Sequence, residues 1–512
     1  MSAKVKNMVH ASKPDIKIAL DGENGLNSIL TYSNLDKISG TVFITCSHNT
    51  LLEALEINFI GMSSMFADTD RAGTNSREGT SKTFVERLTT STAASARAEA
   101  SHIFLRLRQP LSASDLPENM VFEAGKTHKI PFIFVVPQRL LPRVCRHGVD
   151  NDQVRDAHLT VPPSFGDKTV AGRGQELLDD FAPEMSTISY AVSVNLAKSD
   201  SKPIVKARKV RIAPAVDEQP PVSVDGALHD YTMRAEKDVK KGLLKGKLGR
   251  LVLEIAQPKS IRLSSYQTRD QPSLSTMATI MLRFDPAEAS SPPPRLGSLS
   301  SKFKIQNFYA STARTSIPTR KSMIWDASQG VHVESVSLPS RHMTGIEWTH
   351  HETEEQAQLT RRASSSSDNF HPVPAASERY KGAGFYTAQI LVPVSLPTNK
   401  VFVPTFHTCL ISRVYSISLH LGLHSVSMAP TIDLRVPVQI SAEPSAEAQR
   451  RASLTAEQEA MEAMEADDFF VPRVISPIAE NLVGRSSSIA GVSDLPPDYE
   501  NLAGGGMRIQ CY

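Results

Sequence analysis

The strongest candidate for molecular recognition is the stretch "SDLPPDYENL", which contains the sequence Pro-Pro-Asp-Tyr. Pro496 and Pro497 each fix φ near about −65°, which favours the polyproline II conformation before any partner binds. A WW domain accepts such proline rings in an aromatic groove, and a neighbouring pocket accepts a tyrosine placed two residues later. We therefore interpret Pro496, Pro497 and Tyr499 as a PPxY ligand for a WW domain, with Asp498 at the position that is not read.

The stretch "VPPSFG" is a poorer copy of the same motif, because Phe165 stands where the tyrosine would be. It lies among strand-like runs, and we interpret it as a turn inside a folded domain. The sequence thus contains one full PPxY match, and a single match of this kind binds on the order of micromolar. As an aromatic hot spot, Tyr499 is expected to contribute about 2 kcal/mol or more to that binding.

Two similar basic stretches, "RRASSSSD" and "RRASLTAE", place paired arginines two and three residues before Ser364 and Ser453. This spacing suits a kinase with an acidic substrate groove, so both serines are candidate phosphosites. A phosphate adds about −1.5 to −2 charge and can recruit an arginine-lined reader such as a 14-3-3 protein. The alternative is an ordinary solvated charge pair beside each serine.

Lysines and arginines gather on both sides of a predicted hinge. The stretch "KARKVRIAP" supplies a candidate basic patch of Lys206, Arg208, Lys209 and Arg211. After the hinge, "EKDVKKGLLKGKLGR" supplies Lys237, Lys240, Lys241, Lys245 and Lys247. Such charge could meet acidic lipid headgroups, at about 1 kcal/mol for each lysine near the membrane, or an acidic peptide. A solvated flank of the hinge is the alternative.

The sequence lacks the common catalytic motifs. It has no GxxxxGK[ST] phosphate loop, no GxGxxG that opens a helix, no HExxH and no GxSxG elbow. We therefore predict that the protein is not an enzyme. An all-β glycoside hydrolase, which needs two facing carboxylates in a cleft, is the enzymatic alternative that spacing alone does not exclude.

No metal or cofactor site is predicted. Three histidines border glutamates without regular ligand spacing, and we interpret them as part of a solvated loop: His342, His350 and His351, beside Glu352, Glu354 and Glu355. Cys145 and His147 stand two residues apart in an irregular segment, which favours a structural loop over a nucleophile with its base. The four cysteines form no CxxC pair and indicate neither a disulfide framework nor a zinc knuckle: Cys46, Cys145, Cys409 and Cys511.

Composition favours a cytoplasmic protein with long loops. The chain has 512 residues, 33 prolines and a net charge of +2 from 56 basic and 54 acidic side chains, so nucleic acid is not an expected partner. The first residues show no signal-peptide pattern, and the most apolar run, "IPFIFVVP", is too short to cross a bilayer. We expect a cytoplasmic location with peripheral membrane association.

Short runs rich in Val, Ile, Phe and Thr dominate the chain, and long helical periodicity is absent. In "TISYAVSVNL", for example, the apolar side chains of residues 188–196 alternate as on a half-buried antiparallel strand. We predict an all-β protein of two antiparallel β-sandwiches with this organisation: flexible residues 1–14, a first sandwich at 15–212 with a polar loop at 67–100, a hinge at 213–226, a second sandwich at 227–440 with a polar insertion at 350–380, and a disordered tail at 441–512.

This organisation resembles that of the α-arrestins, the arrestin-related trafficking adaptors of fungi. The runs "SGTVFIT", "HIFLRLRQPL" and "FEAGKTHKIPFIFVVP" are similar to strands of the first arrestin domain. "LLPRVCRHG" followed by "HLTVPPSFGD" is similar to a loop of fungal members, and "GRLVLEIAQPKSIRL" to the opening of the second domain. The resemblance covers roughly residues 15 to 440 and implies two arrestin-like sandwiches.

The resemblance implies an adaptor that links a Nedd4- or Rsp5-type HECT ubiquitin ligase to membrane transporters or receptors. The transporter would be ubiquitinated, internalised and sorted to the vacuole or lysosome, with recruitment of the adaptor to plasma membrane and endosomes. It also implies a 14-3-3 switch at Ser364 or Ser453, and ubiquitination of the adaptor itself within the Lys237–Lys247 cluster. The alternative is an arrestin-fold sorting or signalling scaffold that works without ubiquitin.

Overall fold

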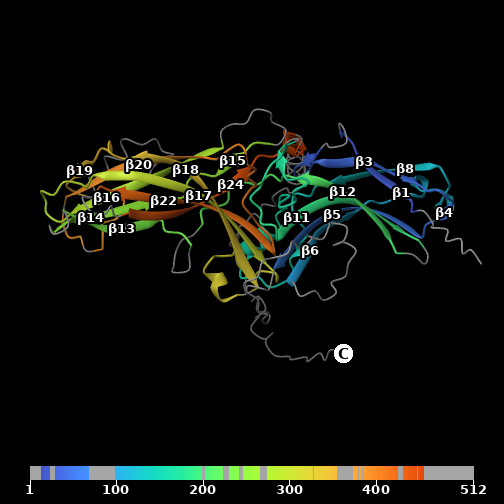
Figure 1. Ribbon diagram of the computed structural model, residues 1–512, viewed down its shortest axis with the longest axis horizontal. Helices are drawn as coiled ribbons and strands as arrows, with labels where there is room; N and C mark the ends of the chain where they lie inside the picture. The colour runs from blue at the N-terminus through green and yellow to red at the C-terminus, as the bar shows by residue number, and fades with distance from the viewer. Residues whose placement is uncertain are drawn as a thin grey trace, which may run out of the picture. The chain divides into compact units, whose positions relative to one another are not determined.

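In the computed structural model, the regular secondary structure of the described residues is mostly β-strand, which confirms the predicted fold class. Antiparallel sheets pack as β-sandwiches (Figure 1). No helix in the described part of the chain is long and apolar enough to cross a membrane. The structure describes residues 13–23, 29–67, 98–173, 176–198, 202–222, 230–241, 246–265, 274–326, 328–353, 373–378, 380–382, 384–424, 431–446, 448–451 and 453–454.

One sheet of the first sandwich has three strands in the order β1-β3-β8. They are β1 (Asp15–Leu20), β3 (Lys37–Thr45) and β8 (Thr127–Val135). Their side chains alternate between buried and more exposed positions, because one face of the sheet packs on the core. At Gly40 a Cβ atom would lie 2.2 Å from the Ala19 carbonyl oxygen, so glycine permits this close approach of β1 and β3.

The facing sheet has five strands in the order β2-β12-β11-β5-β6. They are β2 (Thr31–Tyr32), β12 (Ile204–Ile212), β11 (Ser186–Ala197), β5 (Ala54–Ala67) and β6 (Ala98–Arg108). The strand predicted from "TISYAVSVNL" is β11, but the prediction that it is half-buried is wrong. Ser189, Ala191 and Ser193 on its second face are also buried. Their small side chains allow neighbouring parts of the chain to pack closely over this face, and both serine hydroxyls are hydrogen-bonded.

Short elements connect the strands of the first sandwich. The helix α2 (Asp152–His158) begins after Asn151, whose side-chain oxygen accepts a hydrogen bond from the Val154 amide at 3.0 Å, and it buries His158. The remaining elements are β4 (Thr50–Leu51), β7 (Val121–Phe122), β9 (Gly172–Arg173), β10 (Glu176–Leu177), and the 3₁₀ turns η1 (Ala113–Asp115), η2 (Glu118–Met120) and η3 (Pro142–Val144).

The second sandwich packs the sheet β13-β14-β16-β20-β19 on the sheet β18-β17-β22-β21, in which β23 also pairs with β22. The first sheet comprises β13 (Arg234–Lys240), β14 (Lys247–Ile255), β16 (Ser275–Pro286), β20 (Phe385–Ser395) and β19 (Thr349–His351). The other elements are β15 (Ile261–Leu263), β17 (Leu296–Ala310), η4 (Ser322–Trp325), β18 (Gln329–His342), β21 (Phe406–His407), β22 (Ile411–Leu423), β23 (Thr431–Val438) and β24 (Ile440–Ala442).

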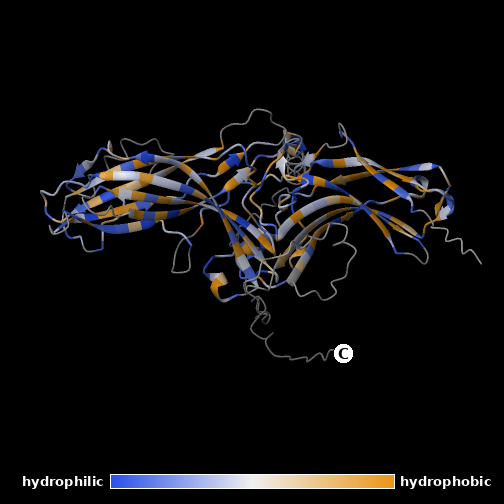
Figure 2. Ribbon diagram, viewed as in Figure 1, coloured by the Kyte–Doolittle hydropathy of each residue, from blue (hydrophilic) through white to orange (hydrophobic). Residues whose placement is uncertain are grey.

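Two hydrophobic cores hold these sheets together, and Figure 2 shows the alternation of hydrophobic and hydrophilic residues along their strands. The first core contains Phe59 and Tyr190, and the second contains Phe303 and Tyr415. Residues of the segment 403–411, which follows β20, are also buried in the first core. Packing therefore joins the two sandwiches through this segment as well as through the predicted hinge.

The described structure extends past the predicted start of the tail at residue 441. β24 pairs with β15, and the Ser445 hydroxyl donates a hydrogen bond to Asp36 Oδ1 at 2.7 Å. Ala448 is 4% exposed, and Arg451 donates to the Leu35 carbonyl. The described residues between 441 and 451 thus contact both sandwiches, which their polar composition did not indicate.

Candidate functional site

Several of the predicted site residues lie outside the described residues. These are the PPxY residues Pro496, Pro497 and Tyr499, the candidate phosphosite Ser364, and Lys245 of the lysine cluster. The structure therefore neither supports nor opposes the interpretation of these positions.

The second candidate phosphosite, Ser453, lies on helical backbone and is exposed. Its hydroxyl donates a hydrogen bond to the Gln449 carbonyl at 2.9 Å. The preceding Arg451, which a kinase would read, is held by the Leu35 carbonyl. An extended bound peptide therefore requires this helical turn to open first.

The described members of the lysine cluster lie on the edge strand β13, directly after it, and at the start of β14. Lys237 donates to the Thr431 carbonyl at 2.6 Å, and Lys240 is exposed. Lys241 pairs with Glu288 at 3.0 Å, and Lys247 pairs with Asp238 at 2.9 Å. Solvent reaches all four side chains, and such exposed pairs contribute only about 0–1 kcal/mol each.

The predicted basic patch on β12 does not form one exposed surface. Arg211 is 5% exposed and its Nε donates to the Val170 carbonyl, and burial lowers its pKa to about 10. Lys209 pairs with Asp167 at 2.7 Å, and Arg208 pairs with Glu23. Neighbouring residues of a strand point to opposite faces, so the four side chains do not share one surface. Of the four, only Lys206 is mainly exposed.

The interpretation of the three histidines as a solvated loop is wrong for His351. It lies on β19, is 3% exposed, and its Nε2 is 2.8 Å from the Thr387 hydroxyl of β20. The ring of His350 packs against Tyr386 at 4.9 Å between centroids. Pairing of β19 with the sheet buries His351, whereas His350 on the same strand and His342 at the end of β18 are exposed.

One cluster of soft ligands forms where α2 meets the turn before β22. Cys145, His147, His158 and Cys409 each offer one ligand atom, and these atoms all lie within 4.8 Å of one another. The Cys145 Sγ lies 3.3 Å from His147 Nε2 and 3.5 Å from His158 Nδ1. Sequence spacing did not reveal His158 and Cys409 as partners of Cys145 and His147, because only the fold brings them together.

Three of the four side chains in the cluster are shielded from water. His158 and both cysteines are buried, and burial, followed by the effect of His147, lowers the pKa of His158 to about 4. Burial, together with the neighbouring Cys145, raises the pKa of the Cys409 thiol to about 12. Without an ion, the His158 ring and the Cys409 thiol are therefore neutral at neutral pH.

Backbone contacts fix the ligand-bearing segments. Arg155 of α2 donates to the Cys145 carbonyl at 2.7 Å, and the Arg314 amide donates to the Cys409 carbonyl at 3.0 Å. The His147 Nδ1 lies 3.0 Å from the Gly148 carbonyl oxygen. Because a carbonyl only accepts, Nδ1 carries the proton and Nε2 presents its lone pair towards Cys145.

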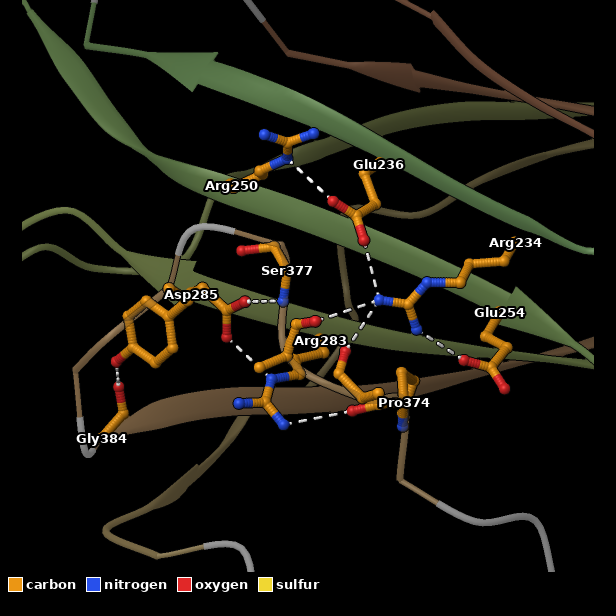
Figure 3. Close-up of polar contacts among 12 residues, drawn as sticks. Arg234, Glu236, Arg250, Glu254, Arg283, Asp285, Pro374, Ser377 and Gly384 are labelled. Atoms are coloured by element: carbon orange, nitrogen blue, oxygen red, sulfur yellow. Dashed lines mark hydrogen bonds and ion pairs between the residues drawn. The ribbon is translucent and has the colours of Figure 1, made fainter.

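A second polar arrangement covers the outer face of the sheet that contains β16, as Figure 3 shows. Arg283 and Asp285 form an ion pair at 2.7 Å and are 2% and 1% exposed. Asp285 accepts a hydrogen bond from the Ser377 amide at 2.8 Å, and Arg283 donates to the Pro374 carbonyl at 3.2 Å. These contacts dock residues 374–377, which lie within the predicted polar insertion, onto the sheet.

Further charged residues on β13 and β14 continue this arrangement. Arg234 lies between Glu236 at 2.7 Å and Glu254 at 2.9 Å, and it also donates to the Ala375 carbonyl at 3.0 Å. Arg250 pairs with Glu236 at 3.0 Å (Figure 3). Each charged side chain of the network has an ion-pair partner within the protein, so the network serves to position the segment 374–377.

These features define the class of the molecule as a two-sandwich, all-β protein with a buried Cys–His cluster. A comparison with protein-family models and a search of curated proteins found no match.

Proposed function

We propose that the chain is an adaptor that links a WW-domain HECT ubiquitin ligase, of the Nedd4 or Rsp5 type, to plasma-membrane transporters or receptors. The ligase then ubiquitinates the bound membrane protein, which is internalised and sorted to the vacuole or lysosome. The observation that carries the proposal is the sequence Pro496-Pro497-Asp498-Tyr499. The two sandwiches supply rigid surfaces for the membrane protein, as the resemblance to α-arrestins implies.

The structure supports a single ligase motif, because the poorer copy at Phe165 is inaccessible. The Phe165 ring is 1% exposed and packs edge-on against Phe406, with 5.6 Å between ring centroids. A WW domain could reach this ring only if the first core opened. Ligase binding should therefore depend on Tyr499.

Tyr499→Ala is expected to weaken binding of the full chain to an isolated WW domain of a Nedd4-type ligase by roughly 30-fold or more. The loss corresponds to the removal of an aromatic hot spot worth about 2 kcal/mol. Isothermal titration calorimetry measures the effect. Asp498→Ala is the matched control, because it changes the unread position, and it should bind within about twofold of the native chain. Native affinity in Tyr499→Ala would refute the ligase assignment.

A truncation separates this adaptor from a ubiquitin-independent sorting scaffold. The structure indicates that the chain should be cut after Leu454, because the buried Ser445 and Ala448 belong to the folded unit. An adaptor loses stimulated internalisation of its transporters when residues 455–512 are removed. A scaffold that uses the sandwiches alone retains it.

Ser445→Ala is expected to increase the rate at which a basophilic kinase phosphorylates Ser453 by roughly tenfold. The Ser445 hydroxyl accepts from the Ala448 amide at 3.0 Å and donates to Asp36, so its removal takes away both a helix cap and a buried tie. Together these contribute about 1–2 kcal/mol to holding the turn closed.

Ser364 of the same variant is an internal control, because its phosphorylation should be unchanged. Site-resolved mass spectrometry of a kinase time course gives both rates. Equal acceleration at the two serines, or none at Ser453, would show that the contact between Ser445 and Asp36 does not limit access.

A further inference from the structure

We propose that Cys145, His147, His158 and Cys409 bind one Zn²⁺ ion, which fastens the segment around α2 to the turn that precedes β22. This site goes beyond the adaptor function and does not depend on it.

The distances in the cluster suit a tetrahedral zinc site. With Zn–S bonds of about 2.3 Å and Zn–N bonds of about 2.0–2.1 Å, tetrahedral sulfur and nitrogen ligands lie about 3.5 Å apart. The Cys145 Sγ is 3.3 Å and 3.5 Å from the two histidine nitrogens, and all four ligand atoms fall within 4.8 Å. An ion therefore fits among them with only small side-chain shifts.

The surroundings have the features of a metal site. A metal-bound histidine usually donates its other ring N–H to a carbonyl or carboxylate, which fixes the tautomer and the ring orientation. His147 does so through Nδ1 and the Gly148 carbonyl. The contacts of Arg155 and of the Arg314 amide hold the backbones of both cysteines. Ligands on separate segments are thus preorganised.

The types and number of the ligands indicate which ion binds and what role it has. Thiolate and imidazole ligands favour Zn²⁺ over Mg²⁺ or Ca²⁺, which prefer oxygen. Two thiolates balance the charge of Zn²⁺, and binding releases the two thiol protons to solvent. Four protein ligands in a buried site leave no open position for substrate, so the ion is structural and not catalytic.

The site joins parts of the chain that are distant in sequence. Cys145, His147 and His158 belong to the first sandwich, whereas Cys409 precedes β22 of the second sandwich. Cys409 is also buried in the first core with the segment 403–411. An ion bound here would therefore hold the 403–411 segment in place against α2.

The test measures metal in the full-length chain purified under reducing conditions. Elemental analysis should find one Zn²⁺ per chain, and replacement by Co²⁺ should give the visible d–d and thiolate charge-transfer bands of a tetrahedral site. Cys145→Ser and Cys409→Ser should each lose most of the metal. Cys46→Ser is the matched control, because Cys46 is equally buried in the first core but outside the cluster, and it should keep the metal.

The native chain alone decides the proposal if a serine variant fails to fold. Absence of bound zinc together with absence of the cobalt bands in the folded, reduced native chain would overturn it. So would full metal content in Cys145→Ser and Cys409→Ser. Recovery of a Cys145–Cys409 disulfide from the reduced preparation, in place of metal, would equally refute it.

Discussion

Asp285→Ala is expected to destabilise the second sandwich by about 3–5 kcal/mol, the effect of removing one member of a buried ion pair. The change takes away the carboxylate that lies 2.7 Å from Arg283, a residue that is itself 2% exposed. It also leaves the Ser377 amide without the acceptor that Asp285 provides at 2.8 Å. Both losses weaken the contact between the outer face of the sheet and the segment 374–377 (Figure 3).

A favourable contact of Arg283 with Phe385 does not compensate for this loss. The guanidinium carbon lies 3.9 Å from the ring centroid, and such a contact contributes about 2 kcal/mol when desolvated. That energy is present in both the native chain and the variant, so it cancels in the difference. The uncompensated term is the desolvation of a guanidinium that has lost its carboxylate.

Urea denaturation followed by circular dichroism compares the variant with the native chain. Asp238→Ala is the matched control on the same sheet: it removes a 41%-exposed carboxylate paired with Lys247, and it should lose at most about 1 kcal/mol. Hydrogen exchange should also become faster at Ser377 in Asp285→Ala alone. Equal stability of the two variants would contradict a structural role for the buried pair.

The fold class could be predicted because the strands carry their own signal. Alternation of apolar side chains in "TISYAVSVNL" located β11 within one residue at either end. The burial of its second face could not be predicted. That burial depends on Asp167, which accepts from Ser189, and on the Asn58 carbonyl, which accepts from Ser193 at a distance of 135 residues in sequence.

The candidate sites were less predictable because their partners are distant in sequence. Local spacing suggested Cys145 and His147 as a loop, but Cys409 reaches the cluster only through the packing of 403–411 into the first core. Charge on β12 suggested a patch, but Lys209 and Arg208 are paired with residues 42 and 185 positions away. Composition likewise placed Ser445 in a disordered tail, although Asp36, 409 residues earlier, binds its hydroxyl.

Arg413→Ala is expected to destabilise the folded unit by about 3 kcal/mol or more and to loosen the contact between the two sandwiches. Arg413 lies on β22 and is fully buried. Its Nε donates to Asn307 Oδ1 at 2.6 Å, and one Nη donates to the Asp180 carbonyl at 2.5 Å. Asn307 in turn donates to the Phe181 carbonyl at 2.8 Å, so two side chains of the second sandwich hold residues 180–181.

Three effects combine in this variant. Truncation opens a cavity beside Phe165, whose ring centroid lies 4.5 Å from the guanidinium carbon. Large-to-small changes in a core typically lower the stability by about 2–5 kcal/mol, and we expect about 3 kcal/mol here. Two buried acceptors also lose their donor, at about 1–3 kcal/mol each. The variant no longer has to bury the charged guanidinium, and this gain offsets part of the destabilisation. The cavity remains.

Arg413→Met separates these effects, because methionine fills most of the volume but donates no hydrogen bond. Its stability should therefore fall between those of the native chain and Arg413→Ala. Arg139→Ala is the surface control, since it removes a 57%-exposed arginine paired with Asp156 and should lose at most about 1 kcal/mol. Denaturation midpoints rank the variants, and hydrogen exchange in residues 176–185 reports the contact between the sandwiches. If Arg413→Ala matches Arg139→Ala in both measurements, Arg413 does not hold the sandwiches together.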